Sequence, residues 1–563
     1  MANYTQTLSN KRLAIIIWII VIFFISVLVK TFNVQINKHK SYVKQANNQR
    51  ERDVRLLANR GYIYDRNKDK FAITIKKDTV FATPYLVEDK EKVAKALSPI
   101  LKESRSNIYE KLSKPGGFVF LKRKVNKSTA DKIKELKIEG IDLYKENERS
   151  YPLGRNASQL LGFVGMDNEG LSGLELKYDK ALKGRIGRLK DEKDAFGKTI
   201  PGTRGQYLKP INGNSLVLTI DREIQHKAQV ELGKAIKEFE AVSGSVTVIN
   251  PQTGEIYAMA SFPNFNLNNY KKASKESMKN RAVISLYEPG STLKIIPAAA
   301  SMAEGVYQSD SSFYLPPTLN VAGKSIKEAH ERGAVNFTLS QIVSESSNVG
   351  ISKVALKLGK KRFYSYLKKF GLLEKTGIDY PGEISGYVAK PEHWYGPTIA
   401  TIAFGQGIAV TPLQLARAYA AIANGGKLKK PYLVRKVLSP AGKTVKTYKP
   451  ETLKKVMSKK ASFEAILMLE KVVAEGTGEV AQIKGYTVAG KTGTAQKPKV
   501  GEKGYGDDYV SSFIGFAPAE NAKVLTLVIV DSPTKGYYGS QVAAPAFKEI
   551  TEFSLQQLNM PPE

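Results

Sequence analysis

The sequence predicts an α+β protein with one membrane-spanning helix, and three observations lead to this fold class. Residues 13–29 form an uncharged run long enough to cross a bilayer. Strand-like runs lie at 244–261 and again at 511–530, with helical patterns between them. Because these strands are far apart in the chain, we expect a sheet assembled from distant segments, which is typical of α+β domains. The 563 residues are 42% hydrophobic, enough for several domains with cores of their own.

The composition excludes several kinds of chemistry. The chain has no cysteine, which excludes disulfide frameworks, thiolate nucleophiles, iron–sulfur clusters and thiolate zinc sites. The four histidines are far apart and form no H-E-x-x-H pair, so a metalloprotease would lack ligands. They are His39, His226, His330 and His393. We therefore expect no metal and no cofactor, and a reaction carried by Ser, Lys, Asp, Glu or Tyr.

The chain is strongly basic, with 86 Lys and Arg against 53 Asp and Glu and a formal net charge of +33. A basic surface raises affinity for phosphate polymers through counterion release. However, the lysines are spread along the chain, and aromatic residues do not interleave with them in a recognisable nucleic-acid module. We predict no specific nucleic-acid partner, and a generic basic surface that faces an anionic polymer or a membrane.

The first predicted element is a membrane-spanning signal anchor at 13–32. Its core reads LAIIIWIIVIFFISVLV, which corresponds to roughly 25 Å of helix, and Thr31 and Phe32 extend it. A cleavable signal peptide has a shorter apolar core and a small-residue cleavage site, and neither is present near Val29. The segment is therefore predicted to be retained as a single span.

Flanking charges do not settle the orientation of this helix, because basic residues lie on both sides of it. A short tail, residues 1–12, followed by a much longer polar chain fits the common arrangement in which the large part is exported. We expect the tail in the cytoplasm, one span in the inner (cytoplasmic) membrane, and the rest in the periplasm or extracytoplasmic space. The lack of cysteine is compatible with an oxidising compartment without demanding one.

Residues 33–211 are predicted to form a separate domain. Residues 33–59 are polar and charged, as in a stalk or an exposed helix. An alternating strand and turn follow at 60–67, and then amphipathic helices alternate with short strands. The Gly/Pro/Lys-rich segment 197–214 marks the boundary with a second domain, residues 212–563.

The second domain has a different pattern. At 221–239, apolar residues recur on one helical face. Two strand-like runs at 244–261 surround a Pro/Gly turn and predict a hairpin. Further strand-like runs lie at 511–517 and 524–530, and the pattern at 544–558 predicts a closing helix. These are the elements of the expected sheet and its helical cover.

One candidate nucleophile is Ser291. Pro289-Gly290 precedes it and the Ala-rich run 295–303 follows, which places Ser291 near a helix amino terminus. The i, i+3 spacing puts Lys294 on the same face. A serine hydroxyl needs a nearby base to attack a carbonyl, and a lysine serves if burial or a neighbouring cation keeps it neutral. Backbone N–H groups at the helix end can also bind an oxyanion.

Ser-x-x-Lys alone is a weak signal, because the same spacing occurs three more times in the chain. Those pairs are Ser41/Lys44, Ser365/Lys368 and Ser532/Lys535. Their surroundings, a stalk, a lysine-rich helical face and a turn before proline, indicate solvated surface.

Two further motifs distinguish Ser291 from that background. Ser346-Ser347-Asn348 follows a segment, 337–344, that predicts a buried helix, and it offers a hydroxyl and an amide to a cleft. Lys491-Thr492-Gly493-Thr494 follows the strand-like run 486–489 and offers a cation, two hydroxyls and a backbone N–H along a sheet edge. The triplet Lys375-Thr376-Gly377 repeats part of this motif but lies in a turn without a comparable strand.

Ser-x-x-Lys, Ser-x-Asn and Lys-Thr-Gly in this order resemble the motifs of the penicillin-binding protein and serine β-lactamase superfamily, which line one active-site cleft. Across nearly the whole chain the sequence looks like a class B penicillin-binding protein. The other segments similar to that class are Arg60-Gly61-x-Ile63-x-Asp65-Arg66-Asn67, Arg149-x-Tyr151-Pro152, Gly170-x-x-Gly173-x-Glu175-x-x-Tyr178, Gly405-Gln406-Gly407 with Thr411-Pro412-Leu413-Gln414, and Tyr538-Gly539 before Ala544-Pro545. Lys68 departs from the glycine that often follows Asp-Arg-Asn, in a turn away from the three motifs.

The resemblance implies a transpeptidase domain, an antiparallel sheet flanked by helices, at 212–563. It implies an elongated, non-catalytic α/β pedestal or dimerisation domain at 33–211. The implied activity is that of a D,D-transpeptidase, which cross-links peptidoglycan stem peptides through a serine acyl-enzyme and is trapped by β-lactams.

The resemblance also implies catalytic roles. Ser291 would attack the D-Ala-D-Ala carbonyl with Lys294 as its base. Ser346 would relay the proton to the leaving amine, and Asn348 would hold the substrate amide. Lys491 would supply positive potential that helps to keep Lys294 neutral.

For substrate binding, the resemblance implies that the hydroxyls of Thr492 and Thr494 hold the terminal carboxylate, with Gly493 between them. The N–H groups of Ser291 and Thr494 would form the oxyanion hole.

A rival reading concerns residues 485–492, which match the P-loop pattern, with 524–531 imitating a strand that ends in a metal-binding Asp. A P-loop must lead into a helix, and Gly493, Pro498 and Gly501 oppose one. Too few residues follow for a doubly wound core. An NTPase is therefore disfavoured.

Other uses of the same motifs stay open. A β-lactamase or carboxypeptidase would deliver water to the acyl-enzyme. No Glu placed for such deacylation is identifiable in the sequence. The membrane anchor and the long non-catalytic first half also favour the transpeptidase. A non-catalytic β-lactam sensor or divisome scaffold also stays open. A bifunctional enzyme with a glycosyltransferase domain is disfavoured, because residues 33–215 are too short.

Within class B, segment 337–348 and the ending 537–561 look more like the septal division enzyme than the elongation enzyme, which stays the alternative. By resemblance, the partners are the membrane, a SEDS-family glycosyltransferase and division regulators, and the ligands are peptidoglycan stem peptides and β-lactams.

Overall fold

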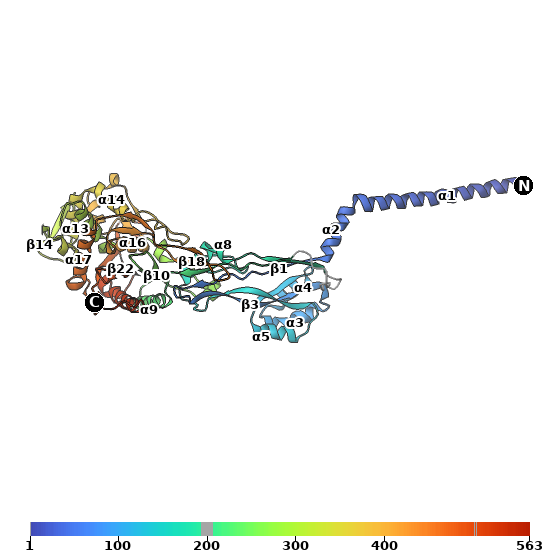
Figure 1. The fold of residues 1–563 in the computed structure, drawn as a ribbon, viewed down its shortest axis with the longest axis horizontal. Coiled ribbons are helices and arrows are strands. Elements are labelled where there is room, and N and C mark those ends of the chain that lie inside the picture. The colour runs from blue at the N-terminus through green and yellow to red at the C-terminus, as the bar shows by residue number, and fades with distance from the viewer. Residues whose placement is uncertain (1, 193–206, 500, 503, 563) are drawn as a thin grey trace. The chain divides into compact units, whose positions relative to one another are not determined.

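The computed structural model describes residues 2–192, 207–499, 501–502 and 504–562 (Figure 1). Contacts divide the chain into two compact units. The first contains the chain up to Ala58 together with Arg185–Ile211, and the second contains the rest. This division follows contacts, so the domain boundary at 211/212 stays a prediction. Most of the predicted boundary segment, at 197–206, lies outside the described residues.

In the first unit, α1 (Ala2–Phe32) contains the predicted membrane segment. Among the described residues, one helical span, Asn10–Asn37, is long and apolar enough to cross a membrane, with a mean hydropathy of 3.0 over an 18-residue window. A π-helical turn, η1 (Asn33–Asn37), and α2 (His39–Arg50) follow it. The predicted stalk therefore begins as helix.

The end of the predicted stalk differs from the expectation, because it forms strand β1 (Glu51–Leu56). This strand pairs antiparallel with β6 (Gly187–Glu192), which pairs in turn with β7 (Tyr207–Leu208). The sequence of β1 is charged and does not alternate with apolar residues, and its partner is far away in the chain. Local patterns therefore could not indicate this strand.

The second unit contains a mixed sheet of seven strands in the order β19-β18-β8-β2-β3-β4, with β5 also paired to β3. The strands are β2 (Ile63–Tyr64), β3 (Lys70–Ala82), β4 (Val119–Val125), β5 (Ile141–Ser150), β8 (Ser215–Leu218), β18 (Val434–Leu438) and β19 (Thr444–Thr447). Strands from both sides of the predicted boundary share this sheet. That sharing explains why residues 59–184 belong to the same compact unit as the carboxyl-terminal part.

Three helices cover the β3–β4–β5 end of this sheet. They are α3 (Lys90–Leu101), α4 (Arg105–Ser113) and α5 (Lys127–Glu135). Leu97, Ile108 and Ile133 from the helices join Val80 and Leu121 from the strands in one core. The mixture of helices and strands agrees with the expected α/β pedestal.

Residues that resemble class B outside the three motifs meet in a buried ion network. Glu175 of α7 (Gly173–Lys177) is fully buried. Its carboxylate accepts hydrogen bonds from Arg60 Nε and Arg149 Nε, each at 2.6 Å. Arg60 also pairs at 2.6 Å with Asp179 of α8 (Asp179–Leu182). Because a buried charge persists only when partners compensate it, this network holds the helices against β5. Helix α6 (Ser158–Leu161) precedes α7 in the chain.

A five-stranded antiparallel sheet forms the centre of the carboxyl-terminal part, in the order β10-β9-β23-β22-β21. The strands are β9 (Ser243–Ile249), β10 (Ile256–Phe262), β21 (Ala489–Pro498), β22 (Tyr505–Ala517) and β23 (Val524–Asp531). The pairing of β9 with β23 confirms the predicted sheet of distant segments. Strand β21 is its edge.

Helices cover both faces of this sheet. Helices α9 (Arg222–Glu238) and α19 (Ala544–Gln557) lie side by side near the carboxyl terminus (Figure 1). Val528 of β23 belongs to the core on that face. Its neighbour Leu527 belongs to the larger core on the other face, together with α11 (Ile295–Ala303) and α16 (Pro412–Ala423). Because successive side chains of β23 point to opposite faces of the sheet, the strand contributes to both cores.

The remaining helices of this part are α10 (Arg281–Ile284), α12 (Leu339–Ser344), α13 (Asn348–Leu358), α14 (Lys360–Lys369), α15 (Thr398–Ala403), α17 (Lys459–Glu475) and α18 (Gly539–Val542). Single-turn helices are η2 (Pro84–Leu86), η3 (Leu267–Lys272), η4 (Gly290–Leu293), η5 (Pro391–His393) and η6 (Glu479–Ala481). Two-stranded pairs are β11 (Ser312–Leu315) with β14 (Val335–Thr338), β12 (Thr318–Val321) with β13 (Lys324–Lys327), β15 (Tyr387–Val388) with β16 (Ile408–Ala409), and β17 (Lys427–Lys429) with β20 (Thr452–Lys455).

Most element predictions for this part are confirmed. The helix expected at 221–239 is α9, the hairpin expected at 244–261 is β9–β10, and the closing helix is α19. One prediction is shifted: the strand expected at 486–489 begins only at Ala489 and runs on to Pro498. Pairing with β22 along its whole length outweighs the low strand preference of its glycines.

Candidate active site

The three motifs line one cleft. A cavity of about 260 Å³ is lined by Ser291 on η4, Asn348 at the start of α13 and Thr494 on β21. Strand β13, Phe404 and Gln406 also contribute to the lining. Lys294 and Lys491 are both fully buried. The structure therefore brings the predicted residues together from three separate elements.

Close backbone contacts hold the turn that carries Ser291. Gly290 has φ +56°, a value that favours glycine. A Cβ atom on Gly405 would lie 2.2 Å from Gly290 O, and one on Gly493 would lie 2.9 Å from Thr292 Cγ2. The turn can therefore approach both the Gly405 loop and β21 only because these positions are glycine. The turn is a 3₁₀ segment, and α11 begins at Ile295, so Ser291 lies near a helix amino terminus as predicted.

Gly493→Ala is expected to lower the thermal stability, because the added Cβ would also lie 2.4 Å from Ser512 Oγ. Overpacking of this kind costs about 1–3 kcal/mol. Thermal unfolding of the full-length protein measures the effect. Gly233→Ala in α9 is the matched control, since its Cβ would meet nothing within 4 Å; alanine there is expected to be neutral or stabilising by up to ~1 kcal/mol. Equal stability of the two variants would contradict this packing account.

Lys294 is placed to exchange a proton with Ser346. Its Nζ donates a hydrogen bond to Ser346 O, and another to Ser346 Oγ at 3.2 Å. Burial, together with the charge of Lys491, lowers the pKa of Lys294 well below its ordinary value, while Glu328 acts in the opposite direction. A neutral amine is the form that can act as a base.

Lys491 lies within β21, and its surroundings include a residue that the sequence did not indicate. Burial lowers the pKa of Lys491 to about 7, opposed by the charge of Glu345. Its Nζ lies 3.4 Å from both Thr477 Oγ1 and Thr492 Oγ1. Thr477, which follows α17, belongs to no motif, so no sequence signal could have identified it.

Lys491→Met is expected to stabilise the protein in a pH-dependent way. The pKa of Lys491 falls from 10.5 to about 7, so between these pH values the unfolded chain binds more protons than the folded one. Wild-type stability therefore rises with pH across that window. The gain of the variant, up to ~5 kcal/mol, should be complete below pH 7 and fade toward pH 10.5.

Denaturant unfolding of Lys491→Met at low and high pH checks this expectation. Lys361→Met, at an exposed position of α14, is the control without pH dependence. A gain that grows with pH would refute the assignment of Lys491 as a buried amine.

The Ser346–Asn348 motif forms the turn into α13. Ser346 has φ +56°, in the left-handed region. Ser347 caps α13 by accepting a hydrogen bond from Gly350 N at 2.8 Å. Asn348 Nδ2 donates to Lys327 O at 3.0 Å, so the amide contacts the hairpin β12–β13. The helix expected at 337–344 is α12, preceded by the end of β14.

The threonines of β21 occupy different surroundings. Thr494 lines the cleft, and its Oγ1 accepts a hydrogen bond from Gly539 N at 3.0 Å. Thr492 is 8% exposed, and its Oγ1 lies 3.1 Å from Thr477 Oγ1. Of the two hydroxyls expected at the carboxylate site, Thr494 therefore lies in the cleft and Thr492 lies behind it.

The segments that repeat parts of the motifs, such as Lys375-Thr376-Gly377 and Ser365/Lys368, lie outside the residues that line the cleft. Thr376 is 1% exposed, and its N–H donates to Glu383 Oε1 at 2.7 Å. Ser365 is exposed on α14, as predicted, whereas Ser532 is 7% exposed, so the prediction of solvated surface is wrong for Ser532. The P-loop reading fails because Gly490–Thr492 lies inside β21, with no turn into a helix. In the described ranges, no group of three His, Asp or Glu side chains is arranged to hold a metal ion.

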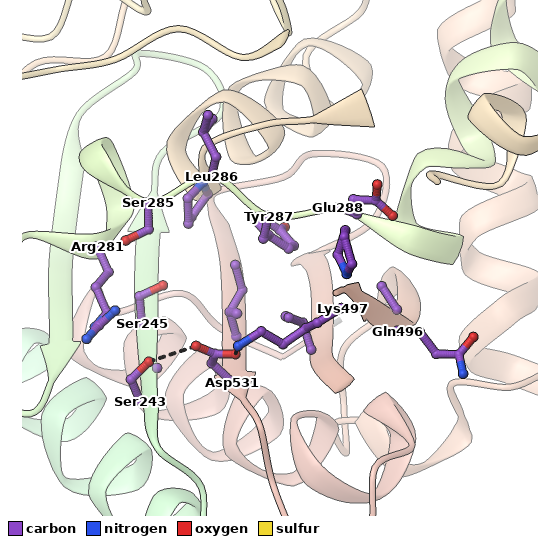
Figure 2. Close-up of a pocket in the computed structure, with 16 residues that line it drawn as sticks. Ser243, Ser245, Arg281, Ser285, Leu286, Tyr287, Glu288, Gln496, Lys497 and Asp531 are labelled. Atoms are coloured by element: carbon purple, nitrogen blue, oxygen red, sulfur yellow. Dashed lines mark hydrogen bonds and ion pairs between the residues drawn. The ribbon is translucent and has the colours of Figure 1, made fainter. Parts of the chain in front are cut away.

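A second cavity of about 160 Å³ adjoins the cleft, and Ala495 lines both. Figure 2 shows Lys497 reaching toward Asp531, to which it pairs at 2.8 Å, while Glu288 points away from this pair. Ser243 Oγ also donates to Asp531, at 3.1 Å. The serine and the lysine here both pair with the same carboxylate, whereas Lys294 Nζ donates to a serine hydroxyl, Ser346 Oγ.

Comparisons with known proteins agree with this geometry. Residues 244–552 match the family described as penicillin binding protein transpeptidase domain, and residues 55–218 match the family described as penicillin-binding protein dimerisation domain. Stage V sporulation protein D of Bacillus subtilis is 37% identical over 98% of this chain and 86% of its own length. Peptidoglycan D,D-transpeptidase FtsI of Escherichia coli is 34% identical over 92% of this chain and 87% of its own length.

Solved structures show the same fold. Penicillin binding protein 3 of Mycobacterium tuberculosis, complexed with aztreonam, superimposes with a TM-score of 0.72 at 29% identity, covering 91% of this chain and 98% of that one. A peptidoglycan synthetase of Bifidobacterium adolescentis gives a TM-score of 0.74 at 28% identity, covering 91% and 98%. The chain belongs to the class B penicillin-binding proteins, which combine a dimerisation domain with a transpeptidase domain.

Proposed function

We propose that the protein is a septal peptidoglycan D,D-transpeptidase, which cross-links stem peptides through a serine acyl-enzyme. One observation carries this proposal: Ser291, Asn348 and Thr494, one residue from each motif, line one cavity, and Lys294 donates a hydrogen bond to Ser346 Oγ. Relatives that match at least 92% of the chain, such as FtsI, are named peptidoglycan D,D-transpeptidases. β-lactams are expected ligands, because a relative of the same fold is complexed with aztreonam.

In the proposed mechanism, Ser291 Oγ attacks the carbonyl between the last two residues of a stem peptide. Lys294 accepts the serine proton in its neutral form. The proton then passes through Ser346 Oγ, which lies 3.2 Å from Lys294 Nζ, to the leaving amine. The peptide C–N bond breaks, and terminal D-Ala leaves. The amine of a second stem peptide then attacks the ester carbonyl and releases Ser291.

The remaining residues bind and orient the substrate in this proposal. The N–H groups of Ser291 and Thr494 stabilise the oxyanion. Thr494, with Thr492 behind it, binds the terminal carboxylate, and Asn348 positions the substrate amide. Lys491 contributes positive potential near that carboxylate, and Gly493 lets β21 approach Ser291.

A cross-linking assay tests this function. The full-length protein in detergent receives a glycan with D-Ala-D-Ala stem peptides and an acceptor amine. Cross-linked dimers are the expected product. Free tetrapeptide without dimers would instead identify a hydrolase, and neither product from an enzyme that still binds penicillin covalently would identify a sensor or scaffold.

We also propose the finer location and partners. The apolar helix α1 favours a single-pass anchor in the cytoplasmic membrane with the large part outside. The family resemblance favours a SEDS-family glycosyltransferase and division regulators as partners. Affinity capture with the wild type and with a variant carrying a foreign anchor and pedestal tests this. Equal recovery of the partner with both proteins would refute docking through those parts.

The relative named stage V sporulation protein D supports a second candidate, cross-linking of a sporulation-specific wall. Expression in cells depleted of their septal transpeptidase separates the two roles. Restored division supports the septal role, and failure to divide with restored sporulation in a sporulation mutant supports the second.

A further inference from the structure

Glu328 is a buried carboxylate for which the mechanism above has no role. It follows β13 directly, and its side chain is only 6% exposed. A carboxylate is rarely buried to this extent unless partners compensate its charge. Its partners therefore indicate what it does.

Both carboxylate oxygens of Glu328 contact the turn that carries the second motif. Oε1 accepts a hydrogen bond from Ser347 Oγ at 2.6 Å, and Oε2 accepts one from Asn348 N at 2.6 Å. Asn348 is the first residue of α13, an 11-residue helix, so its N–H has no partner inside the helix. The carboxylate thus complements both the open N–H group and the helix dipole.

Arg332 holds the other side of the carboxylate. Its Nη2 donates a hydrogen bond to Glu328 Oε1, and its guanidinium lies 4.6 Å from the centre of the Phe337 ring. The backbone oxygen of Lys327, the residue before Glu328, accepts a hydrogen bond from Asn348 Nδ2 at 3.0 Å. The hairpin that lines the cleft and the turn of the second motif are therefore joined at two adjacent residues.

The turn that Glu328 holds presents two acceptors to Lys294. Ser346 lies in the left-handed region, at φ +56°, which residues other than glycine rarely adopt. Both Ser346 O and Ser346 Oγ accept hydrogen bonds from Lys294 Nζ. A backbone conformation of this kind persists where its neighbours over-determine it, and Glu328 binds the next two residues.

The charges that face Lys294 come from two elements. Lys491 on β21 and Arg332 lower the pKa of Lys294, in addition to the larger effect of burial, and Glu328 raises it. Glu345 acts on Lys491 and raises its pKa. Glu328 is thus the carboxylate that balances the cations around Lys294 itself.

We propose that Glu328 is a positioning residue for acylation: it holds the Ser346–Asn348 turn against Lys294 and supplies a negative charge near Lys294. This inference rests on the proposed function. It gives a role in the cleft to the segment that follows β13, and none of the three motifs lies in that segment.

The test compares Glu328→Gln with Glu331→Gln in the full-length protein in detergent. Glu331 is an exposed glutamate of the same segment. Glutamine keeps the shape of Glu328 and removes its charge. For Glu328→Gln we expect the rate constant of acylation by benzylpenicillin to fall about tenfold or more at neutral pH. The acid limb of its pH profile should move to lower pH, because Lys294 loses its proton more easily without the anion. Glu331→Gln should match the wild type in both.

A second readout does not depend on turnover. In protein labelled with ¹³C at lysine Cε, an NMR titration follows Lys294, whose signal is assigned by its loss in Lys294→Met. The pKa of Lys294 is expected to be lower in Glu328→Gln than in the wild type. Glu328→Asp keeps the charge on a shorter side chain, so it should keep the pKa near the wild-type value while acylation stays slower.

Two results would overturn the proposal. One is unchanged acylation and an unchanged Lys294 titration in Glu328→Gln. The other is a uniform loss of rate with lower thermal stability and no change in that titration, which would describe a purely structural carboxylate. A wild type that is never acylated would instead refute the proposed function, and the lysine titration would still decide the role of Glu328.

Discussion

Replacing Ser291 with alanine is expected to abolish both peptide cross-linking and covalent penicillin binding, with a loss of at least ~10⁴-fold in turnover. The variant lacks the hydroxyl that lines the cleft opposite Asn348 and Thr494, three residues before Lys294 in the chain. Alanine fits the partly exposed position of Ser291, so the fold should be unaffected. Release of D-Ala from a stem peptide measures the loss.

The matched control is Ser365→Ala, because Ser365 and Lys368 have the same spacing as Ser291 and Lys294. Both control residues are exposed on α14, outside the residues that line the cleft. The control should keep full activity and stability. Substantial D-Ala release by Ser291→Ala would mean that another nucleophile performs the reaction.

Lys294→Met is expected to reduce acylation by about 10³-fold or more, since a general base of this kind contributes that much. The folded protein should tolerate the change, because methionine has a similar length and removes the cost of burying an amine whose pKa is already lowered by burial. Activity and stability are thus expected to respond differently. Stopped-flow acylation and thermal unfolding of the same preparation measure the two.

Lys368→Met, the exposed counterpart, is the control for this prediction. In the wild type, acylation should slow as the pH falls and Lys294 gains a proton. A Lys294→Met variant with wild-type acylation would show that another group accepts the serine proton. Loss of folding in this variant would show that the amine stabilises the site.

The candidate reacting residues could be predicted from the sequence because each motif adjoins a strong local pattern. The Ala-rich run after Ser291 predicts a buried helix, and α11 is buried in the larger core. The apolar runs near the carboxyl terminus predict β22 and β23, which pair with each other and carry β21 at their edge. Local periodicity is sufficient for such elements, since it reports which face is buried.

The supporting residues could not be found in the same way. Glu328 lies in the polar stretch KSIKEAHERG, where nothing distinguishes one glutamate from the next. Its burial depends on contacts with Ser347 and Asn348, which lie about 20 residues further along the chain. Thr477 likewise meets Lys491 only through the packing of α17 beside β21. Contacts between distant segments leave no periodic signal.

The two threonines of β21 illustrate a further limit. The resemblance gave Thr492 and Thr494 the same role, and the period of a strand puts them on the same face. Thr492 is nevertheless covered by Thr477, whereas Thr494 lines the cleft. The alternation of residues along a strand predicts on which face of the sheet a side chain lies. It does not predict which other segments pack on that face.

The central claim is that Ser291 is the residue that forms the acyl-enzyme, and mapping of the penicillin adduct tests it most directly. The full-length protein is incubated with benzylpenicillin, its intact mass is measured, and the adduct is located by digestion and tandem mass spectrometry. We predict one adduct, on the peptide that contains Ser291, in the wild type and in Ser365→Ala, and none in Ser291→Ala. An adduct on any other residue, or a folded wild type that never forms one, would contradict this claim.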